Sequence, residues 1–542
     1  MTKNYFLFIL LVITLKAPAQ NTVGTVLNTS LAFEGYTLFT VDRDTYLVNN
    51  CGEVVNKWTS DYLSGKSVYV LPNGNLLRAE EIQNPDVPIP GIGGRLTIRS
   101  WNNELLWSYL FTSSTTTSHH DIFPMENGNI LVLIAEKKTK EEAIAEGRDP
   151  NTLLDGPLYN EKIIEIEPVG TNGINIVWEW NFWDHLVQDY DQSKPNFGDV
   201  LNNPQLLDIN YLGFSAGKMN WLHVNSIQLN PDLDQIMISS RQMNEFYIID
   251  HSTTTAEAAS DTGGARGKGG DFLYRWGNPL AYKAGDETDQ KLFGQHFPHW
   301  IEPGLEDEGK VLIFNNGFNR PANYSSVDLM VPTQNPDGSY TLPVGKKIGP
   351  EDFQWTYIDQ TEPVNFYSKI LSNAQRLPNG NTLICEGTKG KFFEIDKDKN
   401  IVWTYISPLG NDGPLSQGDE PAVKGIFRAS KYSPTYSGFT GRDLTPGDPI
   451  ELNFDLSDCQ QVLSVPELVE TERIRFKNPV GDRLIIETNL VVEKVELYNL
   501  QGQRILVANQ EKNINFTYIP SGIYFIKIFT DQGLLSRKII KA

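Results

Sequence analysis

The chain has 542 residues, with 46 Lys and Arg against 67 Asp and Glu, which gives a net charge of −21. Hydrophobic residues make up 40% and charged residues 21%, a balance that excludes wholesale disorder. The acidic excess excludes non-specific binding of nucleic acid or an anionic membrane, because both need a basic surface. Any anion that the protein binds must therefore meet a local cluster of positive groups.

Residues 1–19 predict a secretory signal peptide. Lys3 gives a basic start, an apolar run follows, and residues 17–19 are Ala-Pro-Ala, a small-residue cleavage site. The apolar run is too short to span a bilayer, and no other run in the sequence is longer. We therefore expect an exported protein, secreted or at the cell surface.

Three cysteines in a chain of this length exclude a disulfide-built scaffold and a cysteine-cage metal site. Cys51 and Cys459 lie near opposite ends of the main body and could pair in an oxidising compartment, which would leave Cys385 free. The alternative, three unpaired thiols, stays open at this point.

Two marks recur along the chain. The first is Asn-Gly between apolar runs, at 73–74, 127–128 and 379–380, with degenerate copies at 230–232 and 307–312. Asn-Gly is a strong hairpin signal because both residues tolerate a positive φ. The second is a short apolar strand that carries a tryptophan: Trp58, Trp107, Trp178, Trp276, Trp355 and Trp403. Six such strands predict an all-β fold, a six-bladed β-propeller over 20–462.

The ring is expected to close with strands from both ends of the propeller. The N-terminal part would supply three outer strands of one blade, at 36–41, 46–50 and 54–58. The inner strand of that blade would come from 425–432, so that no strand edge stays unpaired. Insertions are expected at 135–156, helical around 140–147, at 181–219, and in a Gly-rich loop at 252–270.

The chain has only seven histidines, and five of them fall in three places: His119 with His120, His223, and His296 with His299. Each place lies just before a hairpin turn, which predicts the strand nearest the axis. Three such strands would bring the imidazoles together at the central channel. His296 and His299, three apart on one strand, are expected to face opposite sides. His185 and His251 carry no such signal and are expected to be structural.

A lone inner histidine is more often a hydrogen-bonded core residue than a functional one, but convergence of three strands favours function. Neutral imidazole is also a common ligand of zinc or copper, and Asp121 could join such a site. No two of these histidines have the compact spacing of a metal motif. The sequence therefore predicts no bound metal.

Two arginines favour an anion at this channel. Arg241 and Arg320 each end the strand after a histidine-bearing turn, so both are expected near one end of the channel. Guanidinium groups offer a planar fork to oxyanions, and together with imidazoles they suit a tetrahedral anion such as sulfate or phosphate. Taken singly, each arginine would be as consistent with a surface ion pair as with a functional role.

Several segments resemble the arylsulfotransferase (aryl-sulfate sulfotransferase) family over roughly 35–455. They are 119–122, 221–227, 239–241, 293–296, 314–317 with Arg320, and 374–381. The resemblance implies a six-bladed propeller that moves a sulfuryl group from a phenolic sulfate ester to a phenolic acceptor. It implies passage through a sulfated histidine, no nucleotide sulfate donor and no cofactor.

Carried over from the family, His223, His296 and Arg320 would bind the sulfuryl group and assist proton transfer. Candidate substrate-binding residues are Arg241, His119, His120, His299 and Asn225. The family's covalent histidine lies on a later inner strand, which here runs through 372–375 without a histidine. The nucleophile could then be His296 or His299. A propeller that binds a ligand without catalysis is also consistent with the sequence.

The C-terminal segment 463–542 resembles the type A sorting domain of the type IX secretion system of Bacteroidetes. Its alternating strands and turns lie at 478–482, 495–502 and 520–528. We expect a small β-sandwich that is recognised by the secretion machinery.

Three functions are consistent with the sequence. The first is an exported aryl-sulfate sulfotransferase, whose aryl groups would lie against Phe182, Trp183, Tyr190 and Phe197 unless these rings pack on the propeller top. The second is a non-catalytic surface propeller that binds a sulfated or phenolic ligand. The third is a metal-dependent hydrolase that uses His119, His120, His223 and His296. Nucleic acid is not an expected partner, and a homodimer is possible.

Overall fold

The computed structural model describes residues 21–154, 156–421, 424–456, 459, 474–499, 504–530 and 533–542. The predicted signal peptide, 1–19, and the expected boundary at 462–463 lie outside these residues. The chain divides into two compact units, Met1–Asp455 and Leu456–Ala542, which are described separately.

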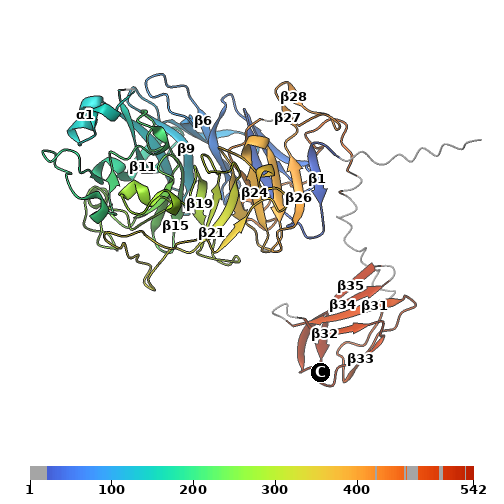
Figure 1. The fold of residues 1–542 in the computed structure, drawn as a ribbon. Coiled ribbons are helices and arrows are strands. Elements are labelled where there is room, and N and C mark those ends of the chain that lie inside the picture. Colours follow the sequence, from blue (N-terminus) through green and yellow to red (C-terminus); the bar gives the residue numbers. More distant parts are fainter. Residues whose placement is uncertain are drawn as a thin grey trace, which may run out of the picture. The chain divides into compact units, whose positions relative to one another are not determined.

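The first unit is a six-bladed β-propeller of six antiparallel sheets (Figure 1). Each blade is listed from its innermost strand outward. Blade 1 is β5 (Ser64–Val70), β6 (Leu76–Glu81), β7 (Gly94–Arg99) and β8 (Leu105–Leu110). Blade 2 is β9 (Thr116–Pro124), β10 (Ile130–Lys138), β11 (Leu158–Val169) and β12 (Gly173–Asn181). Blade 3 is β15 (Val224–Asn230), β16 (Gln235–Ser240), β17 (Glu245–Asp250) and β18 (Tyr274–Trp276).

Blade 4 is β19 (His296–Trp300), β20 (Val311–Asn315), β21 (Ser326–Met330) and β22 (Trp355–Tyr357). Blade 5 is β23 (Asn373–Arg376), β24 (Thr382–Glu386), β25 (Lys391–Ile395) and β26 (Ile401–Ile406). Blade 6 is β29 (Ala429–Tyr432), β2 (Tyr36–Val41), β3 (Asp44–Val48) and β4 (Val54–Thr59).

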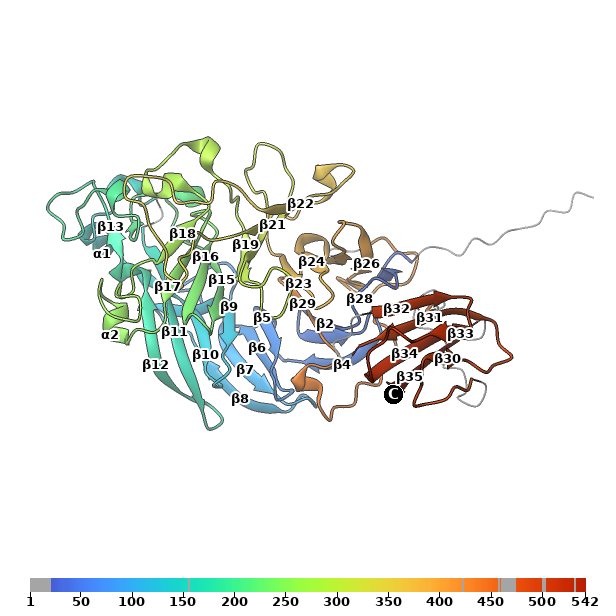
Figure 2. The same ribbon diagram turned by 90° about the horizontal axis from the view of Figure 1, so that it is seen from below.

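The ring closes as the sequence predicts. β29 pairs with β2, so the first and last parts of the propeller share one sheet (Figure 2). The innermost strands contact one another in the order β5, β9, β15, β19, β23 and β29, and β2 contacts β5. A second tie was not predicted: β1 (Gly24–Asn28) adds a fifth strand to blade 5 by pairing with β26.

The six repeated tryptophans lie on β4, β8, β12, β18, β22 and β26, one in each blade. In five of them the indole N–H donates to the next blade along the ring, as the Trp107 N–H does to the Gly173 carbonyl at 2.9 Å and the Trp403 N–H to the Asn50 carbonyl at 2.8 Å. A buried indole needs an acceptor for its donor. The repeat therefore ties each of these blades to its neighbour.

The inner strands share one irregularity that positions the site. Register shifts interrupt the pairing of β5, β9, β15 and β19 with their second strands. A non-glycine residue with positive φ lies in or beside each of these four bulges: Lys66, His120, His223 and Phe297. In blade 5, Ser372 has a positive φ at the corresponding place, just before β23. Bulges redirect side chains, and strained backbone of this kind collects at functional sites. These five places are called the bulge positions below.

The insertions lie outside the blades. The first contains α1 (Lys140–Ala145), as expected, and the second contains a two-strand pair, β13 (Leu186–Val187) and β14 (Leu207–Asp208). The Gly-rich loop holds the short α2 (Thr255–Ala258), and β27 (Leu409–Gly410) pairs with β28 (Gly413–Pro414) after blade 5.

The second unit is a small all-β domain. One sheet has the order β32-β31-β34-β35 and the other pairs β30 with β33. The strands are β30 (Arg483–Ile485), β31 (Val492–Tyr498), β32 (Arg504–Asn509), β33 (Asn513–Asn515), β34 (Gly522–Thr530) and β35 (Gly533–Lys541). Apolar side chains of both sheets share one core, among them Leu484, Val495, Ile514 and Ile526.

Cys51 and Cys459 are both disulfide-bonded, whereas Cys385 is a free, buried thiol. The part of the chain that the structure describes contains no helix long and apolar enough to cross a membrane.

Candidate functional site

Four imidazoles from the inner edges of blades 2, 3 and 4 converge on the channel. This histidine cluster consists of His119, His120, His223 and His296. The rings of His120 and His223 lie 4.7 Å apart, and those of His119 and His120 lie 5.1 Å apart. The ring centroid of Phe427, which precedes β29, lies 6.1 Å from that of His120 and 6.4 Å from that of His296. His119, His120 and His296 are buried, and His223 is half-buried.

The tautomer of His296 follows from its neighbours. Its Nδ1 lies 2.7 Å from Asn316 Oδ1 and 3.2 Å from the Gly294 carbonyl oxygen, and both of these atoms are acceptors. The Asn316 amide is itself oriented, because its Nδ2 donates to the Ser368 and Leu371 carbonyls. Nδ1 therefore carries the proton, and Nε2 presents a lone pair. This Nε2 forms no hydrogen bond with any described residue.

His223 has the opposite tautomer. Asn220 Nδ2 donates to its Nδ1 at 2.7 Å, so the proton of this imidazole is on Nε2. His223 stands at the bulge position of blade 3 with φ of 50°, immediately before β15. The cluster thus holds one imidazole with an open lone pair and one with an open N–H group.

His119 and His120 support the cluster. Their Nδ1 atoms lie 2.8 Å apart, and His119 Nε2 lies 3.6 Å from Glu161 Oε2 without a hydrogen bond. Glu161 Oε2 accepts from the Val224 N–H. Gly91 is required beside His120: its φ is +70°, and a Cβ there would lie 2.2 Å from the imidazole. A larger residue would displace the ring.

Burial keeps these imidazoles neutral. It lowers the pKa of His296 to about 3, helped by the charge of Arg241. The same two causes hold the pKa of His223 well below its usual value, and burial with neighbouring histidines does so for His120. Burial alone lowers the pKa of His119 to about 3. Nitrogen lone pairs are therefore available at neutral pH.

Arg241 is a buried cation without a counter-ion. Its side chain is 8% exposed and its guanidinium lies 4.7 Å from the Phe318 ring. Nothing among the described residues pairs with its charge, and its Nε is a buried donor without an acceptor. Buried guanidinium groups normally have an anionic partner. Arg241 instead lies near two neutral imidazoles, which is an arrangement suited to an oxyanion.

Arg428 is a second cation at the channel, but it is neutralised. Its guanidinium forms a two-pronged ion pair with Asp121 at 3.1 and 3.0 Å, and it donates to the Tyr69 hydroxyl. It also lies 3.8 Å from the Phe297 ring. Asp121 is fully engaged in this pair and in backbone hydrogen bonds.

Arg320 lies apart from the histidine cluster. Its guanidinium packs on Tyr324 at 4.3 Å and donates to the Tyr324 carbonyl and to Ser326 Oγ. Its guanidinium also lies 5.2 Å from the Phe293 ring. The expected place of Arg320 near Arg241 stays a prediction. The role that the family resemblance gives it stays a prediction.

Asn225 and His299 are not members of the histidine cluster. Asn225 Nδ2 donates to the Gln295 carbonyl at 2.7 Å and so links blades 3 and 4. His299 pairs with Leu312 and His296 with Phe314, two residues apart on β20, so both histidines face the same side. The expectation of opposite sides is wrong, because the bulge at Phe297 adds a residue. Burial lowers the pKa of His299 to about 4, and Arg428 and Arg376 are its charged neighbours.

Of the four candidate aromatic walls, Phe182 packs in the core of blades 2 and 3, and Trp183 lies against that core. Tyr190 and Phe197 are exposed. The aromatic ring that does lie against the histidines is Phe427. It falls within the predicted closing strand, but only the folded ring brings it to the cluster.

Sequence reasoning also missed Lys66, Gly91, Glu161 and Asn220. Asn316 lies within 314–317, one of the segments that resemble the family, so its position near the site could have been predicted. Nothing local distinguishes the others.

Within the described ranges, no group of three or more His, Cys, Asp or Glu side chains could hold a metal ion. The cluster offers neutral nitrogen, an N–H donor and an unpaired guanidinium. This set of groups has the chemistry to hold a tetrahedral oxyanion.

The comparison with known families agrees. Residues 18–411 match the model of the arylsulfotransferase (ASST) family, so the chain belongs to that family. Residues 476–542 match a secretion system C-terminal sorting domain. This is the type IX sorting domain, and the protein is exported, to the cell surface or beyond it. No curated protein matches the chain.

Solved structures that resemble the chain are distant. A Bacteroides caccae protein of unknown function is 10% identical, with a TM-score of 0.38 over 73% of this chain and 98% of its own. The periplasmic gluconolactonase PpgL of Pseudomonas aeruginosa is 10% identical, with a TM-score of 0.36 over 74% of this chain and 99% of its own. A streptogramin B lyase is 13% identical, with a TM-score of 0.33 over 72% and 85%.

Proposed function

We propose that this protein transfers a sulfuryl group from an aryl sulfate ester to a phenolic acceptor, with His296 as the nucleophile. The observation that supports this most is the pairing of an open, neutral imidazole nitrogen with a buried guanidinium that lacks a counter-ion. Family membership supports aryl sulfotransfer in general. The choice of His296 rests on its fixed tautomer.

In the first half-reaction, His296 Nε2 attacks sulfur, the bond between sulfur and the aryl oxygen breaks, and the phenolate leaves. The sulfated ring keeps its Nδ1 proton, which Asn316 Oδ1 accepts as a hydrogen bond, so the imidazolium charge meets the oriented amide. Splitting one displacement into two lowers the barrier of each.

Arg241 and His223 would hold the sulfuryl oxygens. Arg241 supplies positive charge where negative charge develops, and its burial makes that interaction stronger than it would be in water. The His223 Nε2–H group donates without being a cation. Since no strong acid faces the leaving oxygen, esters of acidic phenols should react fastest.

In the second half-reaction, an acceptor phenolate attacks sulfur and the nitrogen–sulfur bond breaks, which restores neutral His296. The acceptor proton is lost to solvent on ionisation. His120 and His119 would keep the cluster in place, His299 would line the channel further along β19, and Arg320 would act only if its loop closes over substrate. A homodimer stays a prediction.

A second candidate function, a binding propeller, is favoured by blade 5. Its bulge position is Ser372, whose Oγ donates to Ser368 Oγ, and Asn373 donates to the Ala429 carbonyl. Both side chains are occupied, so blade 5 supplies no nucleophile.

The test is release of nitrophenolate from 4-nitrophenyl sulfate by the protein without residues 1–19 and the sorting domain. Release that requires phenol supports the proposal. Release without phenol would indicate a hydrolase. No release with any of a panel of phenols, from folded protein, would favour the binding propeller.

A further inference from the structure

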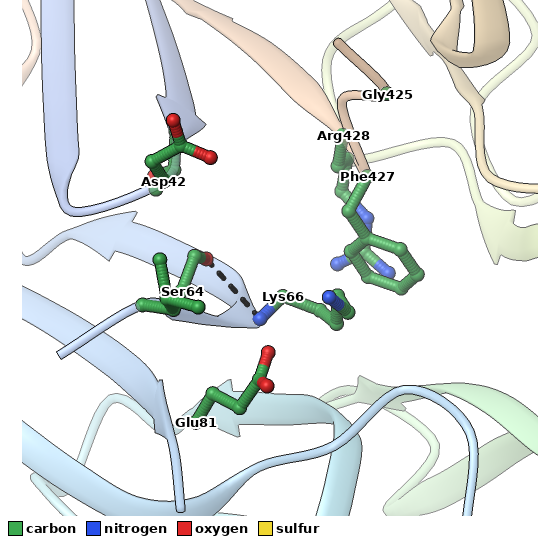
Figure 3. A pocket seen from close by; sticks show the side chains of 9 residues that line it. Asp42, Ser64, Lys66, Glu81, Gly425, Phe427 and Arg428 are labelled. Carbon is green, nitrogen blue, oxygen red and sulfur yellow. Dashed lines mark hydrogen bonds between the residues drawn. The ribbon is translucent and has the colours of Figure 1, made fainter. Parts of the chain in front are cut away.

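Beside the histidine cluster lies a cavity of about 130 Å³ that opens between blades 1 and 6 (Figure 3). Its lining includes Lys66 and Glu81 of blade 1, Asp42 of blade 6, and Phe427 with Arg428 from the closing segment. A cavity of about 150 Å³ can hold benzene, so this one has the size of a single aromatic ring.

One side chain, Phe427, borders both the cavity and the histidine cluster. The Phe427 ring lines the cavity and is also the ring that lies 6.1 Å from His120 and 6.4 Å from His296. A planar ring in the cavity would therefore stack near Phe427 with one edge toward the imidazoles.

Lys66 occupies in blade 1 the place that His120 and His223 occupy in blades 2 and 3. It stands at the bulge position of β5, with φ of 98°. Its backbone N–H donates to Ser64 Oγ at 3.2 Å, and its side chain extends toward Phe427 (Figure 3). A residue in this conformation is held by its surroundings, and the bulge directs it to the channel.

Most charges around the cavity are paired with an opposite charge, but within the described ranges Lys66 and Glu81 are not. Asp42 forms an ion pair with Lys424 at 2.5 Å, and Glu81 accepts a hydrogen bond from Gln83. Arg428 is paired with Asp121. Lys66, which is half-buried, forms no ion pair within the described ranges. Lys66 is therefore the cation of the lining that is left to pair with an anionic group of a ligand.

We propose that the Lys66 cavity binds the carboxylate-bearing end of a phenolic acid, which is the sulfuryl acceptor. This inference rests on the proposed function: Phe427 would contact the ring, Lys66 would pair with the carboxylate, and the phenolic oxygen would face the histidine cluster. The ligand class is a hydroxyphenyl carboxylic acid, such as 4-hydroxyphenylacetate.

The first test is calorimetric binding of 4-hydroxyphenylacetate and of tyramine, which has an ammonium in place of the carboxylate. The wild type should bind the acid at least about tenfold more tightly than the amine. Lys66→Glu should reverse this order. Lys268→Glu, at an exposed lysine of the Gly-rich loop, makes the same change in net charge and should leave the order unaltered.

Equal affinities for the two ligands, binding of neither, or an order that Lys66→Glu does not change would overturn the inference. Thermal unfolding of each variant shows whether it is folded. Lys66→Gln, which removes the charge and keeps most of the side-chain length, should abolish the preference without reversing it. An unchanged preference in this variant would also contradict the inference.

The second test separates this inference from the proposed function. With 4-nitrophenyl sulfate as donor, kcat/KM is compared for phenol, 4-hydroxyphenylacetate and tyramine as acceptors. Transfer to all three without a preference contradicts the Lys66 cavity but leaves the transferase intact. Selective binding that follows Lys66, without transfer to any acceptor, supports the cavity and contradicts the transferase.

Discussion

Buried histidines occur in two regions of this propeller and have opposite surroundings. Away from the channel, in the insertion after blade 2, His185 has an acceptor at each nitrogen, Asp271 Oδ1 at 2.9 Å and the Ala258 carbonyl at 2.8 Å. His251 lies between Asp234 and Glu165. At the channel, His296 and His223 form hydrogen bonds with the described residues through Nδ1, and Nε2 is open.

The difference shows what separates a structural imidazole from a chemical one. Burial lowers the pKa of His251, but the hydrogen bonds that its imidazole donates to Asp234 and Glu165, together with their charges, outweigh burial and raise the pKa to about 9. At the channel no carboxylate compensates burial for His296 or His223, so both stay neutral. Each region has one buried and one half-buried histidine, so the difference in charge state comes from the neighbouring atoms.

The largest effect should come from His296. His296→Gln removes the nucleophile and should lower kcat by at least about a thousandfold. Thermal unfolding should change little, because Gln can keep a hydrogen bond to Asn316. Steady-state kinetics with an aryl sulfate and phenol measure this, and an active His296→Gln would move the nucleophile to another residue.

The next effect concerns stability and the outer region. Because the pKa of His251 is raised above its unfolded value of about 6.5, its contribution is complete below that pH and is lost as pH rises through about 9. The free energy of unfolding should fall over this window by at most about 3 kcal/mol. Denaturant titrations from pH 6 to 9.5 measure it, since these span the two values.

The matched control for that fall is His251→Gln. This variant should be less stable at pH 6 and show a flatter profile. An equally steep fall in the variant would assign the effect to another group.

A comparison of the two arginines sharpens the account of the channel. Arg241→Gln should lower kcat/KM by about ten- to a hundredfold, as expected for loss of one group that stabilises developing charge. Arg320→Gln should have the smaller effect, because its guanidinium is bonded to the 316–325 loop. A larger loss for Arg320 would show that this loop closes over the substrate.

The smallest effect should come from Asn316, which orients His296 without touching substrate. In Asn316→Asp a carboxylate faces Nδ1, so the pKa of His296 should rise. Activity should then fall as pH decreases, in a range where the wild type is unaffected. A loss of activity that is the same at every pH would indicate a purely structural role.

The blades could be predicted from the sequence because their signals are local. Asn-Gly turns and one tryptophan per outer strand set the period, and both ends of blade 6 have their own strand pattern. β1 was missed, since a five-residue segment shortly after the predicted signal peptide shows nothing of its partner.

The site could be predicted only in part. Spacing before the turns placed the histidines on inner strands. The bulges were not visible, so the shared side of His296 and His299 and the channel place of Lys66 were missed. The direction of Arg320 depends on a folded loop, and the unpaired state of Arg241 depends on which carboxylates the fold brings near it.

The most direct test of the central claim is to trap the sulfated residue. The protein is mixed with 4-nitrophenyl sulfate without an acceptor, quenched at alkaline pH, digested and analysed by mass spectrometry. The account predicts one added SO₃ on the peptide that contains His296, formed with a burst of nitrophenolate equal to the enzyme and absent in His296→Gln. Sulfation of a peptide with His223 or His120, or turnover to phenol with no sulfated peptide, would contradict it.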